Sequence, residues 1–256
     1  NFIGDADKRI KEDYLRILRY LRFFLNYSKK PHNLDILKKI KKNIDGVSKL
    51  SKERLLDELK KITEIQALEK LTKDKECLEI ILMIFPELKN IKIFSKSNLI
   101  IKELLKEKDF IFLLSLMIID ETDNADYFLY KFNISKKNQK RIKIIDNFYK
   151  EKINSKTFTE NNLNKFFYYN GKEAITDILC HKMIRSKKTY NNLKRLISHY
   201  EKNKVPLIPV NANLLMNKYK IIEGKQLGEK LKIIEEEWVK NNFKISDQQI
   251  NDIVKN

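Results

Sequence analysis

Hydrophobic side chains recur along this chain at the spacing of amphipathic helices. With an advance of about 100° per residue, a helix predicted over Asp7–Tyr27 has an apolar side made of Ile10, Tyr14, Ile17, Leu18, Leu21, Phe24 and Leu25. The opposite side carries Arg9, Glu12, Asp13, Arg16, Arg19 and Phe23. That second side is unusually rich in groups that can hydrogen-bond a ligand.

The same period continues toward the C-terminus, with short polar breaks. Ser51 and Thr72 are predicted N-caps, Ser246 and Gln249 have capping-box spacing, and Gly46 is a predicted helix stop. The predicted helices cover Leu34–Ile44, Ser51 to about Ile65, Lys73–Phe85, Leu99–Tyr130 as one helix or two, Lys137–Lys152, Asn161–Tyr169, Lys172–Arg185, Tyr190–Lys202 and a short stretch after Ser246.

Glycine usage points to an all-α fold. The chain has 5 glycines, whereas average usage of roughly 7% would give about 18. Strand connections, tight turns and phosphate-binding loops depend on glycine, so an α/β nucleotide-binding fold is not expected. We predict an elongated multi-helix array in three successive segments, residues 1–71, 72–130 and the more basic 131–256.

The formal net charge of +18 favours a polyanionic partner, with nucleic acid as the first candidate. An AT-rich genome would also raise the number of lysines, but it would not require so few acids. We expect basic side chains of the third segment to lie along RNA backbone phosphates, recognising duplex shape more than bases. These side chains are expected around Lys136–Lys143, where Lys137, Lys140, Arg141 and Lys143 are the candidates, and around Arg185–Arg195.

Cysteine and histidine form no recognisable ligand pattern. Cys77 and Cys180 stand far apart and the three histidines are scattered, so no spacing resembles a zinc site or a disulfide framework. We therefore predict no metal ligands in this chain and a reducing, cytoplasmic location. The longest apolar stretches, such as Phe110–Ile119, have the length of core helices, so no membrane span is expected.

The most specific pattern is IGDADKRIKEDYLRILRYLRFF, residues 3–24. It resembles the segment shared by class II tRNA nucleotidyltransferases, the CCA-adding enzymes, and bacterial poly(A) polymerases. The matching residues are Arg9, Ile10, Glu12, Asp13, Leu15, Arg16, Arg19, Arg22 and Phe23. In that family the Glu-Asp-x-x-Arg element is an amino-acid template for the incoming nucleotide. The resemblance implies nucleotide binding by Asp13 and Arg16, supported by Glu12 and Arg9, and RNA binding by Arg19 and Arg22.

The residue types agree with a template role for Asp13 and Arg16. At spacing i, i+3 on one helix, the carboxylate and the guanidinium share a face and present an acceptor beside a donor. Cytosine and adenine each carry an amine donor next to a ring-nitrogen acceptor, whereas guanine and uracil present the reverse. A wrong base would leave buried polar groups unpaired, at a cost on the order of several kcal/mol. The simpler interpretation is a surface salt bridge contributing roughly 0.3–0.5 kcal/mol.

Two later stretches extend the resemblance. SKERLLDELKKI, residues 51–62, is similar to the neck segment that follows the template in the family. A tail found in some bacterial members is matched by Gly224, Leu227, Gly228 and Trp238. The resemblance thus implies that residues 1–71 are a neck with the template helix, 72–130 a helical body, and 131–256 a tail that binds the tRNA acceptor end.

No part of the sequence matches the family's catalytic head, where a Gly-Gly segment and an Asp-x-Asp pair hold the phosphates and two Mg²⁺ ions. Asp5-Ala6-Asp7 has the right spelling but is predicted to cap a helix. The chain begins with Asn1, which suggests part of a larger protein. The resemblance implies that the intact protein joins a tRNA 3′-hydroxyl to the α-phosphate of CTP or ATP, and that this chain alone is inactive.

Other functions stay open at this point. A poly(A) polymerase of the same family would add only A, and enzymes with partial activity would add only CC or only the terminal A. A non-catalytic RNA-binding module would have kept the neck and lost the head. A basic helical scaffold would bind acidic proteins and no tRNA. The sequence makes no prediction of oligomeric state.

Overall fold

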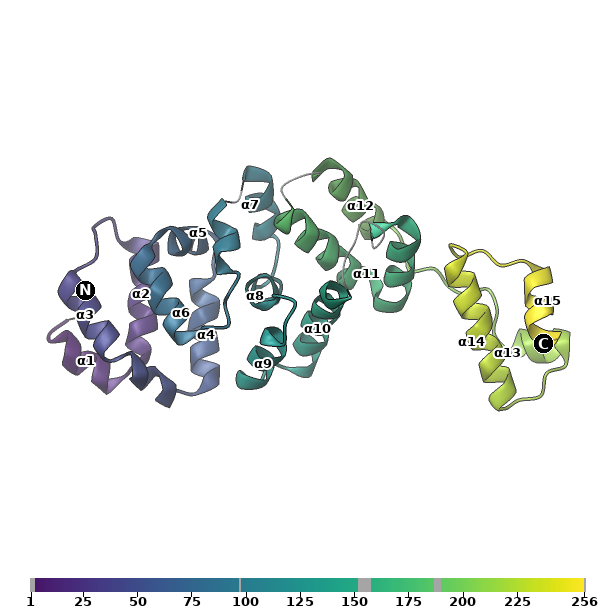
Figure 1. Ribbon diagram of the computed structural model, residues 1–256, viewed down its shortest axis with the longest axis horizontal. Coiled ribbons are helices and arrows are strands. Elements are labelled where there is room, and N and C mark those ends of the chain that lie inside the picture. The colour runs from purple at the N-terminus through teal and green to yellow at the C-terminus, as the bar shows by residue number, and fades with distance from the viewer. Residues whose placement is uncertain (1–2, 97, 152–157, 187–189, 256) are drawn as a thin grey trace. The chain divides into compact units, whose positions relative to one another are not determined.

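The computed structural model describes residues 3–96, 98–151, 158–186 and 190–255, and every regular element within these ranges is a helix (Figure 1). This confirms the all-α prediction. In chain order, with η for 3₁₀ helices, the elements are α1 (Ala6–Glu12), α2 (Leu15–Tyr27), α3 (Leu34–Lys42), η1 (Ile44–Lys49), α4 (Lys52–Ile62), α5 (Ile65–Lys73), α6 (Lys75–Ile84), η2 (Ile91–Lys96), α7 (Leu99–Lys106), α8 (Phe110–Ile118), α9 (Asn124–Lys131), α10 (Lys136–Lys150), α11 (Glu160–Arg185), α12 (Tyr190–Lys202), α13 (Ala212–Tyr219), α14 (Lys225–Lys240) and α15 (Asp247–Lys255).

The helices divide into two compact units. The first contains residues 1–150 and 180–188, and the second contains 151–179 and 189–256. The segment boundaries predicted at residues 71 and 130 both fall inside the first unit and stay predictions. No helix among the described residues combines the length and apolar character that crossing a membrane requires.

The core of the first unit is built by the apolar sides that the sequence pattern predicted. Helix α2 packs against α4 and α5, and its inward residues Ile17, Leu18 and Leu21 are fully buried together with Leu59 and Ile62 of α4. Burial of each such side chain contributes about 1.5–3 kcal/mol. This packing fixes the face of α2 that turns away from the core, where the candidate site lies.

The single helix predicted over residues 7–27 is wrong, because the chain breaks between α1 and α2. Asp13 adopts an extended conformation with φ −153° and ψ 103°. Its backbone carbonyl accepts a hydrogen bond from the N–H of Arg16, and its carboxylate accepts one from the N–H of Leu15. Asp13 thus forms a local turn with the residues that follow it, and such side-chain hydrogen bonds to the backbone compete with a continuous helix. The break also places the ring of Tyr14 over Gly46, where a Cβ would lie 2.0 Å from a ring carbon.

Three other predicted boundaries need correction. Helix α3 ends at Lys42, and Gly46 lies within η1 rather than ending α3. Asp74, not Thr72, caps α6, because its carboxylate accepts the N–H of Cys77. The Leu99–Tyr130 segment forms three helices, α7, α8 and α9, and Asp109 begins α8 by capping it.

Several predicted helix ends are confirmed. Ser51 caps α4, Asp5 caps α1, and Ser246 and Gln249 exchange the hydrogen bonds of a capping box. Helix α10 ends at Lys150, short of the predicted end at Lys152, since Glu151 lies in a turn.

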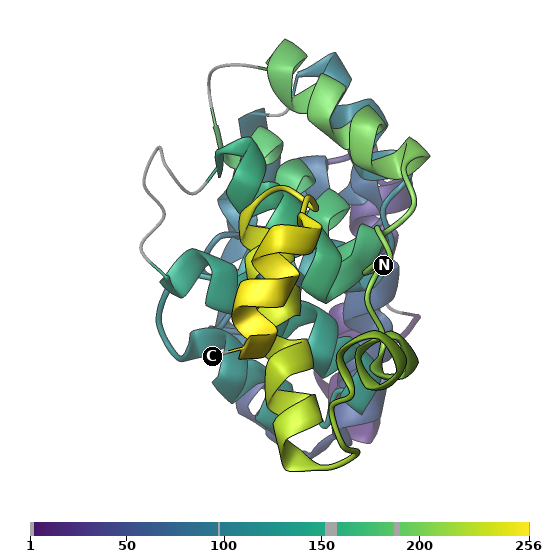
Figure 2. The same ribbon diagram turned by 90° about the vertical axis from the view of Figure 1, so that its right-hand side faces the viewer.

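The second unit contains a kinked helix and a small C-terminal core. Gly171, with φ 80°, produces the kink inside α11 that separates the two helices predicted there. Helices α14 and α15 lie side by side (Figure 2). Leu215, Leu227, Ile234 and Ile250 form the centre of the core that α13, α14 and α15 share.

Candidate nucleotide and RNA interface

Asp13 lies in the break between α1 and α2, and its carboxylate is directed at Arg54 of α4. Nη2 of Arg54 donates to both carboxylate oxygens, at 3.0 and 3.1 Å. Nη1 of Arg19 lies 3.9 Å from Oδ2 of the same carboxylate. These contacts hold an acid at the start of α2 while leaving part of it exposed, since the Asp13 side chain keeps 23% of its surface accessible.

The other three predicted nucleotide-binding residues form a group of their own. Oε2 of Glu12 accepts hydrogen bonds from Arg9 at 2.6 Å and from Arg16 at 2.7 Å. Nη1 of Arg16 also donates to the backbone carbonyl of Arg9 at 2.6 Å. The hydrogen bond from Arg16 and the nearby Arg9 charge lower the pKa of the Glu12 carboxyl. Glu12 is therefore an anion that positions the guanidinium of Arg16.

The geometry revises the premise that Asp13 and Arg16 share a face of one continuous helix. Asp13 is in extended backbone, whereas Arg16 is in the first turn of α2. Within the described part of the chain, each pairs with another residue, Asp13 with Arg54 and Arg16 with Glu12. Both contacts of Arg16 use Nη1, so its remaining N–H groups are directed elsewhere. The roles in nucleotide binding stay predictions.

Arg19 and Arg22, predicted to contact RNA, flank a buried acid. The Glu58 side chain of α4 is 3% exposed and lies 3.7 Å from Nε of Arg19 and 3.5 Å from Nε of Arg22. Lys61 adds a hydrogen bond to Oε1 at 3.2 Å. Three cations around one buried carboxylate leave a net positive charge on this surface. Glu58 therefore orients the two arginines, but its single negative charge does not neutralise both of them.

An open cleft of about 940 Å³ runs along the outer side of α2. Arg16 and Arg19 line it at one end, and Lys29 and Lys30 supply further positive charge. Its other lining side chains are the aromatic Tyr20, Phe23, Phe24 and Tyr27, the polar Ser28 and Asn33, and the apolar Pro31. Phe23 is 53% exposed and Tyr27 is 75% exposed. Cations beside accessible aromatic rings suit a ligand with phosphates and a flat base.

Only one of the four predicted nucleotide-binding residues lines this cleft. Arg16 does so, whereas Asp13 is turned toward Arg54 and lies outside the lining formed by the described residues. Arg19 links Asp13 to the cleft, because Arg19 lines the cleft and also lies near the Asp13 carboxylate.

The basic residues predicted to bind RNA in the tail lie on α10, within the first unit. Lys137 and Lys140 are exposed. Nη1 of Arg141 pairs with Asp109 at 2.6 Å, and Nζ of Lys143 lies 3.3 Å from Asp126. Lys137 and Lys140 are thus better candidates for phosphate contact than Arg141, whose side chain is 17% exposed.

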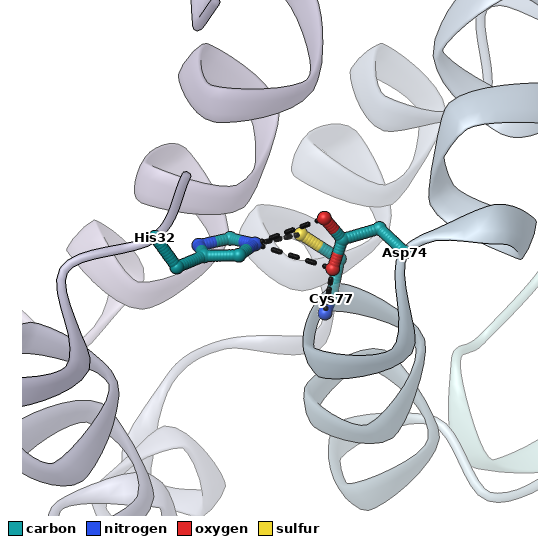
Figure 3. A group of neighbouring side chains, drawn as sticks. All are labelled: His32, Asp74 and Cys77. Atoms are coloured by element: carbon teal, nitrogen blue, oxygen red, sulfur yellow. Dashed lines mark hydrogen bonds and ion pairs between the residues drawn. The ribbon is translucent and has the colours of Figure 1, made fainter. Parts of the chain in front are cut away.

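His32, Asp74 and Cys77 come together although no spacing in the sequence suggested it. Nε2 of His32 lies 3.0 Å from Oδ2 of Asp74 and 3.6 Å from Sγ of Cys77 (Figure 3). Burial raises the pKa of the Cys77 thiol. Asp74 and Cys77 follow His32 by 42 and 45 positions, which is why spacing rules miss the group.

Sequence reasoning missed Arg54 and Glu58 as site residues. Both belong to SKERLLDELKKI, the stretch whose resemblance to the family was recognised, but taken alone that stretch has the pattern of a generic amphipathic helix. The signal that could have identified Glu58 is a charged residue on the apolar side of a helix, because Glu58 falls between the buried Leu55 and Leu59.

The sequence is similar to tRNA nucleotidyltransferases. A family model described as tRNA nucleotidyltransferase domain 2, putative, matches residues 102–254. The chain is also similar to curated proteins named CCA tRNA nucleotidyltransferase 1, mitochondrial: 49% identical to the human protein and 48% to the mouse protein, each over 63 residues. Each match covers 24% of this chain and 14% of the relative, so only a small part of those proteins is represented.

A solved structure resembles the whole chain. The crystal structure of the Bacillus stearothermophilus CCA-adding enzyme in complex with CTP aligns over 100% of this chain and 64% of that one, with a TM-score of 0.66 and 16% identity. At that identity the likeness shows a common fold. The cytoplasmic location stays a prediction, since the curated relatives are named as mitochondrial.

Proposed function

This chain belongs to the tRNA nucleotidyltransferase family, and we propose that it is the part of a CCA-adding enzyme that selects CTP and ATP and binds the tRNA acceptor end. The observation that carries the proposal is the open cleft along α2, which Arg16 and Arg19 of the Glu-Asp-x-x-Arg region line beside exposed aromatic rings. The similarity to proteins named as CCA tRNA nucleotidyltransferases supports it.

Nucleotide selection in this proposal depends on Asp13 and Arg16. Arg16, held by Glu12 through Nη1, presents its remaining N–H groups to the ring-nitrogen acceptor of cytosine or adenine. Asp13 accepts the exocyclic amine of the same base, which must extend past Arg19 beyond the lining of the cleft to reach the carboxylate. A carboxylate has about four lone-pair directions, so the hydrogen bonds from Arg54 and Leu15 do not exhaust it. Guanine or uracil would place an acceptor against the acid and a donor against the guanidinium.

The RNA contact is proposed to use charge in two places. Arg19 and Arg22 carry positive charge near the cleft, and Lys137 and Lys140 carry it on α10. Phosphate contacts of this kind give affinity without base specificity. Arg9, Arg141 and Lys143, each paired with an acid, are proposed to supply further phosphate contacts.

Metal-dependent transfer is proposed to require residues outside this chain. Two Mg²⁺ ions need several oxygen ligands arranged around the reacting phosphate. Asp5 and Asp7 are used otherwise, since Asp5 caps α1 and Asp7 binds Lys11 and Asn43. We therefore expect residues 1–256 to bind substrates without transferring a nucleotide.

The test is an assay of the full-length protein that contains this chain, given a tRNA that ends before CCA and each nucleoside triphosphate in turn. The proposal predicts addition of two C residues and then one A, and no product from GTP or UTP. Addition of A alone, over many residues, would identify a poly(A) polymerase. Binding of tRNA without transfer would identify a non-catalytic RNA-binding module, and failure to bind tRNA would overturn the proposal altogether.

A further inference from the structure

We propose that His32, Asp74 and Cys77 form a binding site for Zn²⁺ behind the cleft. The three residues come from two parts of the first unit (Figure 3). His32 lies in the segment between α2 and α3, Asp74 precedes α6, and Cys77 lies in its first turn. One ligand atom from each lies within 4.8 Å of the others.

The two separations from His32 are close to the edges of a tetrahedral zinc centre. Zinc bonds of about 2.0–2.2 Å to nitrogen or oxygen and about 2.3 Å to sulfur, at tetrahedral angles, place ligand atoms about 3.3–3.6 Å apart. Nε2 of His32 lies 3.6 Å from Sγ of Cys77 and 3.0 Å from Oδ2 of Asp74. Small side-chain rotations would therefore accommodate the ion without moving a helix.

The two oxygens of Asp74 have separate tasks. Oδ1 accepts the N–H of Cys77 at 2.9 Å and so caps α6. Oδ2 makes the shorter contact to His32 and is the oxygen available to an ion. The cap fixes Asp74 and Cys77 relative to each other, which reduces the ordering that metal binding must impose.

The surroundings of His32 fix its ring as metal ligands usually require. The Tyr20 hydroxyl lies 3.0 Å from Nδ1, and the ring of Phe24 stacks on the imidazole with centroids 3.5 Å apart. With zinc on Nε2, the proton of the neutral imidazole resides on Nδ1 and is donated to the Tyr20 oxygen. The outer hydrogen bond that orients a ligating histidine is thus already in place.

The ligand chemistry selects zinc over magnesium. A thiolate and an imidazole are soft or intermediate donors, whereas Mg²⁺ prefers oxygen ligands in an octahedron. The carboxylate and the thiolate together carry two negative charges, which a divalent ion neutralises. The Cys77 side chain is fully buried and the Asp74 side chain is 26% exposed, so solvent can supply a fourth ligand from the Asp74 side.

An ion at this position would connect the cleft to the core of the first unit. Pro31 and Asn33, the neighbours of His32, both line the cleft, and so does Tyr20. Bound zinc would tie that lining segment to α6 and hold Tyr20 in place. The bound ion is therefore expected to support the shape of the cleft, with its fourth coordination position left to solvent.

Cobalt binding to residues 1–256 tests the site, after treatment with a chelator and reduction of the thiols. One equivalent of Co²⁺ is expected to bind and to give a thiolate-to-cobalt charge-transfer band, and Zn²⁺ is expected to displace it and to raise the melting temperature. Cys77→Ser should abolish the band, and Tyr20→Phe should weaken zinc binding roughly 10–100-fold.

Matched variants separate this site from the other thiol and imidazole groups. Cys180→Ser and His199→Ala should leave the band unchanged, because neither residue belongs to the group that His32, Asp74 and Cys77 form. Should Cys77→Ser fail to fold, Asp74→Asn, which can still cap α6, must weaken zinc binding. The proposal is wrong if the unaltered chain gives no charge-transfer band, if Cys77→Ser retains it, or if Cys180→Ser loses it equally; the three side chains are then only a hydrogen-bonded clamp.

Discussion

The carboxylate of Asp13 accepts two hydrogen bonds from one terminal nitrogen of Arg54, at 3.0 and 3.1 Å, across 41 positions of sequence. The pairing joins the break between α1 and α2 to the first turn of α4. An acid outside a helix can adopt many orientations, and the charge-assisted hydrogen bonds from Nη2 of Arg54 restrict them. Arg54 is therefore a positioning residue for the proposed base-selecting acid.

Replacement of Arg54 by alanine is expected to raise the KM for CTP and ATP more than it lowers kcat. The Arg54 side chain is 47% exposed, so solvent screening limits the effect to about 1 kcal/mol, or roughly fivefold. Arg54→Lys should recover part of it. Lys60→Ala removes the same charge from the exposed side of α4 and serves as the control. Equal effects of the two alanine variants on KM would contradict a positioning role.

The fold class and the motif could be predicted from the sequence, because both depend on residues close together in the chain. Helical periodicity and few glycines are properties of short windows, so the buried side of α2 was predicted correctly. The break at Asp13 was not predicted, because the free energy of a local side-chain hydrogen bond to the backbone differs little from that of a continuous helix. Arg54 and His32 could not be placed, since their partners lie 41 and 42 positions away.

Glu58→Gln should destabilise the first unit. The carboxylate is 3% exposed and lies near Arg19, Arg22 and Lys61. An amide in its place would put buried N–H donors against guanidinium groups, at a cost of about 1–3 kcal/mol. Urea denaturation monitored by circular dichroism measures the change. Glu53→Gln, an exposed change on the same helix, should alter stability by less than about 0.5 kcal/mol; similar values for both would refute the prediction.

Lys137→Ala and Lys140→Ala should weaken tRNA binding and reduce its salt dependence. Removing one lysine–phosphate interaction lowers the slope of log K against log salt by roughly 0.7–0.9. Fluorescence anisotropy with labelled tRNA at several salt concentrations gives the slope. Lys232→Ala provides a matched removal of charge on the exposed side of α14. A slope unchanged in the α10 variants, or reduced to the same extent by Lys232→Ala, would remove α10 from the interface.

Stability of the chain should fall in mild acid because of His181. Burial, with smaller contributions from Arg185, Lys108 and Arg141, holds the pKa of this imidazole well below 6.5. The folded chain therefore keeps His181 neutral while the unfolded chain takes up a proton, so stability is present above the unfolded pKa and is lost as pH falls below it. The expected decrease is about 1.4 kcal/mol between about pH 7.5 and about pH 5.5.

Urea midpoints across that pH range measure the effect of His181. His181→Gln, which retains a polar group beside the hydroxyl of Ser115, should flatten the pH dependence even if it lowers stability overall. His199→Gln, at an exposed position, should leave the slope as it is. A His181→Gln chain with an unchanged slope would assign the acid sensitivity to another group.

The most direct measurement of the central claim is the ratio of kcat/KM for CTP to that for UTP in the full-length protein and its Asp13→Ala variant. If Asp13 and Arg16 together select the base, loss of the acid should lower the ratio roughly a hundredfold, whereas Asp57→Ala, an exposed acid on α4, should leave it unchanged. An Asp13→Ala enzyme that still prefers CTP as strongly as the unaltered protein would contradict the account.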